Sequence, residues 1–350
     1  MKNSRLLGLL LLALALPLSF AQDLVEVTFQ SKWFPQAQFA GYFVAQDKGF
    51  YAEEGLNVTI LDGGNVNPTV QVASGNADFG TDWSANMLVQ RDQGLDVVMI
   101  AQMYQDSGYR LVALRDSGIE EFADLAGRTV GVWGFGNEFA AEVIFDVMEL
   151  TSNLDPTVTN PDVEAVVYAF DPALVFPDEV DAASAMTYNE LDQIVGLGYP
   201  LDTLNILDPA DIDAAIMEDL VFTRPDVLNM ANFKGSDMSG REVAERFLRA
   251  SIRGWEYAVA NQEESVQIVL ANCGDTCAGS GSTSSPLIHQ TWQLARAAEL
   301  VKPTPDTAVG AIDRAAFDRT VELLVQVGLI GEPVAYEDVV DSTIYEVAAQ

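Results

Sequence analysis

The sequence is poor in basic side chains, histidine and cysteine. Its 350 residues include 18 Lys and Arg against 52 Asp and Glu, one His and two Cys, and the formal net charge is −34. Phosphate backbones and acidic membrane surfaces are bound by clustered Lys and Arg, so this composition excludes a nucleic-acid partner and argues against an acidic membrane surface. The acidic residues are spread along the chain, which is typical of a solubilising surface.

The few cysteines and the single histidine argue against a metal site. Cys273 and Cys277 are four positions apart beside a stretch rich in Gly and Ser. In an exported protein this spacing predicts a local disulfide, because a metal site would need further ligands. His289 is expected to be a partly buried structural residue, with a ligand role as the alternative.

Long apolar runs are also missing after the N-terminus. Lys2 and Arg5 precede an apolar stretch over residues 6–18, which ends at Ser19-Phe20-Ala21. This is the pattern of a secretory signal peptide over residues 1–21, shorter than the ~20 apolar residues of a spanning helix. An uncleaved anchor is the alternative reading. No cysteine follows the apolar core, so lipid attachment there is not expected, and the mature chain is expected not to insert into the membrane.

Strand and helix patterns alternate along the chain. The ~330 residues after the signal peptide exceed what one hydrophobic core usually serves, which predicts two lobes. Short apolar runs are separated by segments with helical spacing, as in a mostly parallel sheet flanked by helices. Later residues favour helices that return to the first lobe, at 243–260, 286–300 and 314–327. The strands are expected at 25–29, 57–60, 97–102, 111–114, 129–133 and 163–169.

Several short motifs, taken in order, resemble one family. Residues 33–42 read Trp-Phe-Pro-Gln-Ala-Gln-Phe-Ala-Gly-Tyr, and Lys-Gly-Phe-Tyr at 48–51 and Ala-Asp-Phe-Gly at 77–80 follow. Together with residues 131–139 and 185–190 they resemble the type 2 periplasmic solute-binding proteins of ABC importers, in the branch that binds thiamine pyrimidine precursors and riboflavin. Each motif alone is weak, but their order and spacing are specific. The resemblance covers residues 25–190 well and the C-terminal third loosely.

The resemblance implies an architecture and a role. It implies an α/β fold of two lobes joined by two crossovers near Leu114 and Ile212, with the ligand held between closing lobes. Lobe 1 would comprise residues 23–114 and 213–350, and lobe 2 residues 115–212. The expected partners are a small heteroaromatic ligand and an ABC permease with its ATPase. The protein is expected to be periplasmic, to need no cofactor and not to be an enzyme.

The candidate ligand-binding residues follow predicted strands. Ligands of α/β sheets bind beyond the carboxyl ends of the strands, so the loops after residues 30, 80, 102, 133 and 186 should face the cleft. Their aromatic, amide and carboxyl side chains suit a flat heteroaromatic ligand, and the lack of an Arg or Lys cluster disfavours a phosphorylated one. The predicted residues are Trp33, Phe34, Gln38, Asp82, Trp83, Tyr104, Asn137, Glu138, Tyr188, Asn189 and Glu190.

Each of these residues also has a purely structural interpretation. Trp33 and Trp83 could pack in the core, and Glu138 could be a first-turn helix carboxylate. The polar run at 188–190 could be a turn with a helix cap, and Gln38 could lie on the surface.

The ligand and the class of protein each have alternatives. The residues at 36–42 and 186–190 look more like those of riboflavin binders, and a thiamine pyrimidine precursor (formylaminopyrimidine or hydroxymethylpyrimidine) is the alternative. A pyrimidine synthase is another, because fungal relatives of this fold make that pyrimidine; such chemistry needs a reactive His and a Lys for an aldehyde. A secreted sensor domain without a transporter is a third reading, which sequence does not separate from an importer component.

Overall fold

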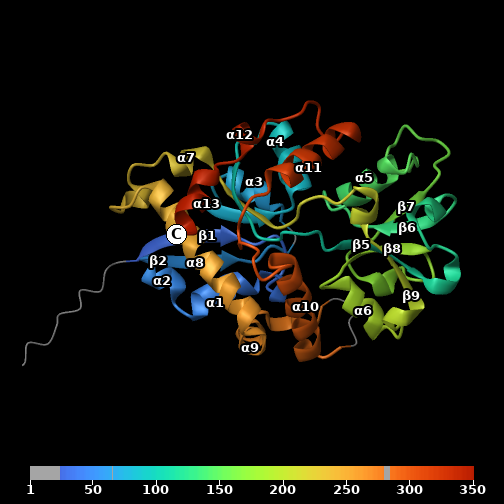
Figure 1. The fold of residues 1–350 in the computed structure, drawn as a ribbon, viewed down its shortest axis with the longest axis horizontal. Helices are drawn as coiled ribbons and strands as arrows, with labels where there is room; N and C mark the ends of the chain where they lie inside the picture. Colours follow the sequence, from blue (N-terminus) through green and yellow to red (C-terminus); the bar gives the residue numbers. More distant parts are fainter. Residues whose placement is uncertain (1–23, 65, 280–283) are drawn as a thin grey trace, which may run out of the picture.

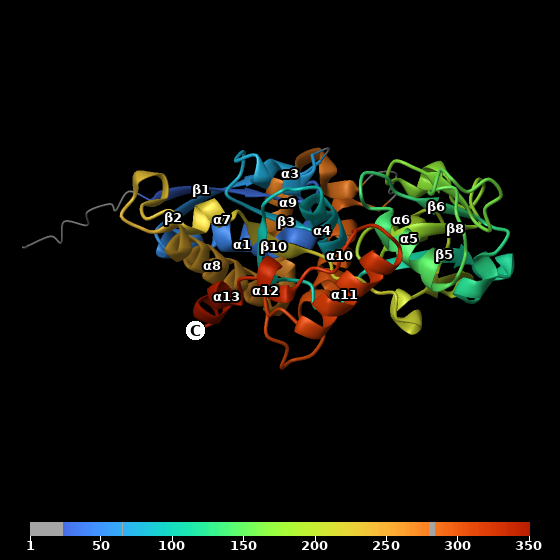
Figure 2. The ribbon, with the colours of Figure 1, turned by 90° about the horizontal axis from the view of Figure 1, so that it is seen from above.

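Two five-stranded sheets form the two halves of the molecule (Figure 1). The computed structural model describes residues 24–64, 66–279 and 284–350, so the predicted signal peptide lies outside the described residues. In both views the sheet with β5 to β9 lies at one end of the long axis and the sheet with β1 and β2 at the other (Figure 2). Each half is therefore a lobe with its own sheet.

The sheet of the first lobe has the order β2-β1-β3-β10-β4. Strand β10 is antiparallel to both β3 and β4, while β1 is parallel to β2 and β3. Four strands therefore share one direction and β10 opposes them. The strands are β1 (Val25–Gln30), β2 (Leu56–Leu61), β3 (Phe79–Asp82), β4 (Val98–Gln102) and β10 (Leu220–Thr223).

The sheet of the second lobe repeats this plan with the order β7-β6-β8-β5-β9. Here β5 is the antiparallel strand, between β8 and β9. The expectation of two mostly parallel sheets is confirmed. The strands are β5 (Tyr109–Leu114), β6 (Thr129–Val132), β7 (Glu164–Val167), β8 (Ala182–Met186) and β9 (Leu204–Leu207).

The chain crosses between the lobes twice. Strand β4 belongs to the first sheet and β5 to the second, so the first crossover lies between Gln102 and Tyr109. The second lies between β9 and β10. The domain boundaries predicted at 114 and 212 would leave β5 in the first lobe, whereas its pairing with β8 and β9 places it in the second sheet. An antiparallel strand that opens a new lobe carries no sequence signal of that change.

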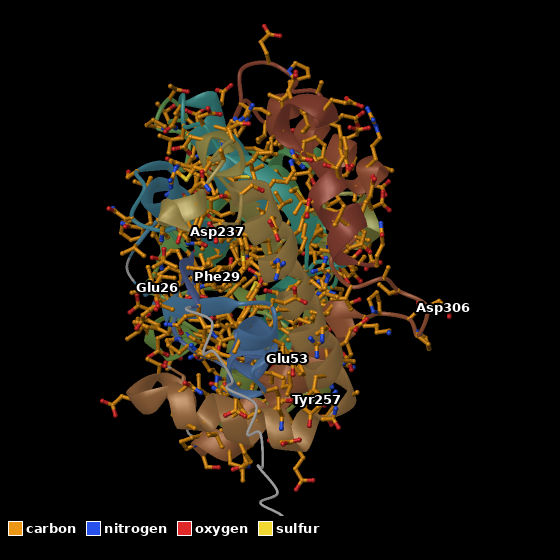
Figure 3. All side chains as sticks on the ribbon, turned by 90° about the vertical axis from the view of Figure 1, so that its left-hand side faces the viewer. Glu26, Phe29, Glu53, Asp237, Tyr257 and Asp306 are labelled. Atoms are coloured by element: carbon orange, nitrogen blue, oxygen red, sulfur yellow. A yellow bond between two sulfur atoms is a disulfide. The ribbon has the colours of Figure 1, made fainter. Side chains whose placement is uncertain are left out.

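Helices α1 (Ala40–Asp47) and α8 (Gly240–Ala260) pack closely on the first sheet. A Cβ at Gly254 would lie 2.0 Å from the carbonyl oxygen of Gly41, so the contact requires glycine there. Along β1, Glu26 faces solvent while Phe29 is buried, 5.5 Å between ring centres from Phe247 of α8 (Figure 3). The helix predicted at 243–260 does return to the first lobe.

Two later helices contact both lobes. Helix α10 (Pro286–Val301) packs on α9 and α8 and also contacts α6, and α11 (Arg314–Gln326) contacts α4 and α5. Both helices were expected to return to the first lobe only, whereas each also contacts a helix of the second lobe and so bridges the two lobes. The remaining α-helices are α2 (Phe50–Glu53), α3 (Pro68–Ala73), α4 (Ser84–Asp92), α5 (Phe139–Val147), α6 (Glu190–Gly196), α7 (Pro225–Leu228), α9 (Gln262–Asn272), α12 (Tyr336–Val339) and α13 (Ser342–Ala348).

Over the described part of the chain, no helix combines the length and the apolar character that crossing a membrane requires.

Candidate functional site

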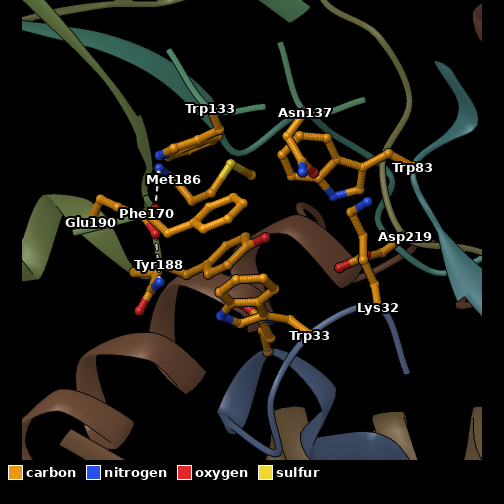
Figure 4. A pocket seen from close by; sticks show the side chains of 12 residues that line it. Lys32, Trp33, Trp83, Trp133, Asn137, Phe170, Met186, Tyr188, Glu190 and Asp219 are labelled. Atoms are coloured by element: carbon orange, nitrogen blue, oxygen red, sulfur yellow. Dashed lines mark hydrogen bonds between the residues drawn. The ribbon is translucent and has the colours of Figure 1, made fainter. Parts of the chain in front are cut away.

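A narrow cleft lies between the two lobes. Residues of the first lobe, including Lys32 and Trp83, line it together with residues of the second, including Trp133 and Glu190. Six of the twelve lining side chains are aromatic or apolar and the other six are polar or charged. Aromatic surface combined with a few placed polar groups is typical of small-molecule sites. The lining residues are Lys32, Trp33, Gln38, Trp83, Trp133, Asn137, Phe170, Met186, Tyr188, Asn189, Glu190 and Asp219 (Figure 4).

Aromatic pairs span the cleft from lobe to lobe. The rings of Trp33 and Phe170 lie 4.5 Å apart between centres, and those of Trp83 and Trp133 lie 6.3 Å apart. Phe170 also stacks on Trp133 at 6.1 Å. Tilted and stacked rings at these separations attract one another. The two walls of the cleft are therefore aromatic, and a flat ring system could replace the contacts that the walls make with each other.

The backbone of Phe170 is in the left-handed region, with φ of 61°. A non-glycine residue there is uncommon, and for a bulky side chain it is strained. Phe170 lies three residues after Val167, the last residue of β7, and its ring packs against those of both Trp33 and Trp133. The strain is thus located at a cleft residue, as is common at functional sites.

Lys32 is held by a buried carboxylate. Its Nζ lies 2.7 Å from Asp82 Oδ1 and 4.8 Å from the centre of the Trp83 ring. Asp82, which ends β3, is fully buried and also accepts hydrogen bonds from Thr69 Oγ1 and the backbone N–H of Trp83, both at 2.8 Å. The positive charge at the cleft is therefore neutralised within the first lobe.

Glu190 begins α6 in the second lobe and faces the cleft. Its carboxyl accepts hydrogen bonds from the backbone N–H of Met186 at 2.9 Å and from Nδ2 of Asn189 at 2.6 Å. Burial raises the pKa of Glu190 to about 7. This carboxyl can therefore be either neutral or charged near neutral pH.

Asn189 links this wall of the cleft to α10. Its Oδ1 lies 3.0 Å from Nε2 of His289 and 3.3 Å from Nε2 of Gln293. The other ring nitrogen of His289 lies 2.7 Å from Asp192. His289 is fully buried and does not line the cleft. The only histidine of the sequence thus supports Asn189 from behind, as part of a polar contact between α10 and α6.

Asp219 lines the cleft immediately before β10. It is 3% exposed, its φ is 49°, and neither carboxyl oxygen has a hydrogen-bond partner among the described residues. Burial raises its pKa well above the usual range, and the neighbouring Glu218 adds to this effect.

Seven of the eleven residues predicted from the sequence line the cleft: Trp33, Gln38, Trp83, Asn137, Tyr188, Asn189 and Glu190. Their roles in binding stay a prediction. All seven come from loops that follow parallel strands or from the first turn of the helix after such a loop, where the rule on carboxyl ends locates them.

The other four predicted residues lie beside the cleft. Phe34 packs edge-on against Trp33 and lines an adjoining hollow. Asp82 holds Lys32. The hydroxyl of Tyr104 donates to the carbonyl of Gln38 at 2.9 Å. Glu138 precedes the first residue of α5 and accepts a hydrogen bond from the backbone N–H of Gly136 at 2.8 Å, so it is not the first-turn helix carboxylate considered as its alternative.

Five cleft residues were missed by the sequence-based prediction: Lys32, Trp133, Phe170, Met186 and Asp219. The first four stand at or directly after the ends of predicted strands or beside a predicted residue, so the same rule could have included them. Asp219 precedes a strand that was not predicted. Because β10 is antiparallel, its amino end lies at the edge of the sheet where the other strands have their carboxyl ends.

A larger hollow, which we call the extension, adjoins the cleft and shares Lys32, Trp33, Asn137 and Phe170 with it. Four further side chains of its lining are amides, namely Asn67, Asn86, Gln90 and Gln93. The aromatic part of the site thus continues into a part that offers hydrogen-bond donors and acceptors.

Cys273 and Cys277 lie in the turn that follows α9 and are joined by a disulfide. The carbonyl oxygens of Thr276 and Cys277 accept hydrogen bonds from Gln36 at 2.8 Å and Gln290 at 2.7 Å. Gln290 in turn accepts from the backbone N–H of Ala37 at 2.7 Å. The disulfide-closed turn therefore supports the loop that carries Trp33 and Gln38. Within residues 24–64, 66–279 and 284–350, no group of three or more His, Cys, Asp or Glu could hold a metal ion.

Two lobes, each built on its own five-stranded sheet and with a cleft between them, define a periplasmic-binding-protein fold. The ligand-binding component of an ABC-type import system from Staphylococcus aureus superposes with a TM-score of 0.60 at 13% identity, over 93% of this chain and 99% of the other. This similarity concerns the fold.

A profile of the NMT1/THI5-like family matches residues 36–265, and the chain belongs to that family. A riboflavin-binding protein of Chloroflexus aurantiacus is 28% identical over 89% of this chain and 83% of its own length. A formylaminopyrimidine-binding protein of Halalkalibacterium halodurans is 24% identical over 98% and 99%. A 4-amino-5-hydroxymethyl-2-methylpyrimidine phosphate synthase of Legionella pneumophila is 25% identical over 70% and 72%. The family predicted from the sequence is confirmed.

Proposed function

We propose that this protein is the extracytoplasmic solute-binding component of an ABC importer and that it captures riboflavin between its two lobes. The observation that carries the proposal is the aromatic cleft to which both lobes contribute, with Trp33 and Trp83 on one side and Trp133 and Phe170 on the other. A ligand that stacks on both walls stabilises the closed form over the open one, which is the differential affinity that closure requires.

The shape of the site supports a flavin. Indole and phenyl rings provide stacking surfaces for a tricyclic heteroaromatic ring. The adjoining extension, lined by amides such as Asn67 and Gln90, offers hydrogen bonds to the hydroxyl groups of a ribityl chain. The similarity to a riboflavin-binding protein over most of both chains supports the same ligand.

A thiamine pyrimidine precursor is the second candidate. The carboxyls of Glu190 and Asp219 both line the cleft, and carboxyls bind amino groups of heterocycles well. The similarity to a formylaminopyrimidine-binding protein extends over nearly the whole of both chains. A pyrimidine would occupy the aromatic part of the site alone.

The placement of the histidine and the lysine supports binding over synthase chemistry. The twelve lining residues include no histidine, and His289 is buried behind Asn189. Lys32, the one lysine among the lining residues, is paired with Asp82. A lysine that reacts with an aldehyde needs its amine free to approach the carbonyl carbon, whereas the amine of Lys32 is in an ion pair with Asp82.

The proposed partners are a permease and its ATPase, and the proposed location is the periplasm. A signal peptide over residues 1–21 would export the chain. Genes for a permease and an ATPase beside this gene would support import, and their absence would favour a secreted sensor that binds the same ligand.

Calorimetric titration of the chain from Gln22 onward tests the proposal. The probes are riboflavin, formylaminopyrimidine, hydroxymethylpyrimidine and thiamine. Saturable binding of riboflavin with a dissociation constant of about 1 μM or below, equivalent to about −8 kcal/mol, is the expected result. Binding of a pyrimidine alone would replace riboflavin by the second candidate, and binding of none of the four would contradict both.

A further inference from the structure

Asp219 is a buried acid whose carboxyl has no hydrogen-bond partner in the part of the chain that the structure describes. The nearby Lys32 charge and Tyr104 hydroxyl oppose the rise in its pKa that burial causes, but the Tyr104 hydroxyl donates to the carbonyl of Gln38. The side chain of Asp219 lines the cleft. The other acids around the cleft are satisfied: Asp82 binds Lys32 and Glu190 accepts from the Met186 backbone. Buried polar groups in folded proteins are nearly always hydrogen-bonded, so an exception at a cleft calls for a ligand group that completes it.

The backbone of Asp219 is held in place as well. Its φ of 49° is in the left-handed region, which Asp tolerates better than most residues. Its carbonyl accepts a hydrogen bond from the backbone N–H of Met103 at 3.1 Å, which ties the start of β10 to the residue after β4. Conformational strain and an unsatisfied carboxyl both lower stability, and the side chains packed around Asp219 do not offset either cost.

Within the cleft, Asp219 lies on the same side as Lys32 and Trp83, and Glu190 lies on the opposite side, with the rings of Phe170 and Tyr188 nearer to Glu190 (Figure 4). Lys32 is already bound to Asp82 at 2.7 Å. The cleft therefore presents one satisfied carboxyl at one end and one unsatisfied carboxyl at the other, and a planar ligand between the aromatic walls would direct its edge toward Asp219.

We propose that Asp219 determines ligand specificity by binding an N–H group on the edge of the heterocycle. This inference rests on the proposed function and applies to both candidate ligands, because a flavin offers a ring imide N–H and the pyrimidine precursors offer an amino group. Burial raises the pKa of the Asp219 carboxyl, so the neutral acid is favoured. A neutral carboxyl accepts one hydrogen bond and donates another, which matches an N–H beside a carbonyl or an amino group beside a ring nitrogen.

Two substitutions separate this role from a structural one. Asp219→Gly removes the carboxyl and suits the left-handed backbone, whereas Asp219→Asn keeps one acceptor and one donor in the same shape. Asp213→Gly is the matched control, because Asp213 also has a positive φ, of 55°, but is exposed and does not line the cleft.

The experiment is a calorimetric titration with two pairs of probes. Each pair contains a ligand with the N–H and one without it: riboflavin with 3-methylriboflavin, and 4-amino-5-hydroxymethyl-2-methylpyrimidine with its 4-dimethylamino analogue. For the pair that contains the protein's ligand, we expect the wild type to bind the member with the N–H about 10- to 100-fold more tightly than the member without it. Asp219→Gly removes this preference, Asp219→Asn retains most of it, and Asp213→Gly leaves it unchanged.

Equal binding of both members by the wild type, or an equal loss for both in Asp219→Gly, would overturn the inference. If the wild type binds none of the four probes, the proposed function is wrong, and a second measurement still decides the inference. Because an acid that awaits a ligand destabilises the ligand-free protein, we expect ligand-free Asp219→Asn to melt at a higher temperature than the wild type at pH 8. A lower melting temperature would show that Asp219 serves the fold.

Discussion

Glu218 and Ser107 join the two crossovers between the lobes. The carboxyl of Glu218, just before β10, accepts a hydrogen bond from Ser107 Oγ at 2.6 Å. It also accepts from the backbone N–H groups of Gly108 and Tyr109, at 2.9 and 3.2 Å. One buried side chain thus fastens the segment that leaves the first lobe to the segment that returns to it, next to the cleft residue Asp219.

This clamp predicts a dependence of stability on pH. Burial raises the pKa of Glu218 from its usual 4.5 to about 7, so between these values the folded protein holds a proton that the unfolded chain has released. The stabilisation is complete below pH 4.5 and is lost as the pH rises through 7. In the wild type the free energy of unfolding should fall between pH 5 and 8 because of Glu218. In Glu218→Gln this fall should be smaller by on the order of 3 kcal/mol. Urea unfolding at four pH values measures it.

Glu322→Gln is the control for that series, since Glu322 is an exposed residue of α11. Its curve should run parallel to that of the wild type. A Glu218→Gln protein whose curve also runs parallel to the wild type would contradict the assigned effect of burial.

Removing an indole from the cleft should weaken ligand binding. Trp33→Ala deletes the ring that faces Phe170 at 4.5 Å, and with it a stacking surface. We expect the affinity for riboflavin to fall by about 10-fold or more, because stacked aromatic pairs contribute about 0.5–1.5 kcal/mol beyond the area they bury. Phe50→Ala, which removes a ring packed on Tyr257 outside the cleft, should leave affinity unchanged. Similar affinities for Trp33→Ala and wild type would place the ligand elsewhere.

The pairing of Lys32 with Asp82 predicts discrimination against phosphorylated ligands. Lys32 is the only cation among the residues that line the cleft and its extension, and Asp82 neutralises it. Riboflavin 5′-phosphate should bind about 10-fold or more weakly than riboflavin, because its charge would be desolvated without a free cation. Asp82→Asn removes the charge that neutralises Lys32, so it should reduce the ratio of the affinity for riboflavin to the affinity for riboflavin 5′-phosphate.

Asp78→Asn is the matched control for this effect. It breaks a similar pair, with Lys234 at 2.6 Å, at the amino end of β3, whereas Asp82 is at the carboxyl end of β3 beside the cleft. Its ratio of affinities should equal that of the wild type. An unchanged ratio in Asp82→Asn would mean that Lys32 does not interact with the phosphate.

Opening the disulfide should affect both stability and binding. Cys273 and Cys277 close a short loop, for which loop entropy alone gives about 2 kcal/mol. The carbonyls of Thr276 and Cys277 support Gln36 and Gln290 next to the loop that carries Trp33, so affinity should fall together with the melting temperature. Melting with and without a thiol reductant measures the first effect, and titration of Cys273→Ser/Cys277→Ser the second. Reductant should not change that double variant.

The sequence predicts the walls of the cleft better than its polar end. Trp33, Trp83 and Asn137 follow parallel strands, and the carboxyl-end rule locates such residues without any knowledge of packing. Tyr104 and Glu138 follow strands too, yet their side chains turn to the Gln38 carbonyl and the Gly136 backbone. Which way a side chain in a loop turns depends on partners that are distant in the sequence.

Asp219 shows a second limit. It is placed by β10, a four-residue strand that pairs between β3 and β4 although it lies more than a hundred residues later in the chain. A short apolar run such as Leu220–Thr223 does not specify a strand on its own, because periodicity needs more residues than it contains. The lobe to which β5 belongs is likewise decided by strands far along the chain, since β5 pairs with β8 and β9. The sequence-based prediction therefore placed the first crossover at residue 114, after β5, whereas it lies before β5.

Three of the five tryptophans, Trp33, Trp83 and Trp133, line the cleft. A chromophore that enters the cleft would come close to three of the five tryptophans, which are the strongest fluorophores of the protein. An isoalloxazine absorbs where indole emits, so excitation energy would transfer to it. The tryptophan fluorescence of the protein would then be quenched in proportion to the fraction of clefts that hold the ligand. A colourless pyrimidine would leave that emission largely in place. The chain therefore carries its own optical reporter, able to tell the two candidate ligands apart without a label.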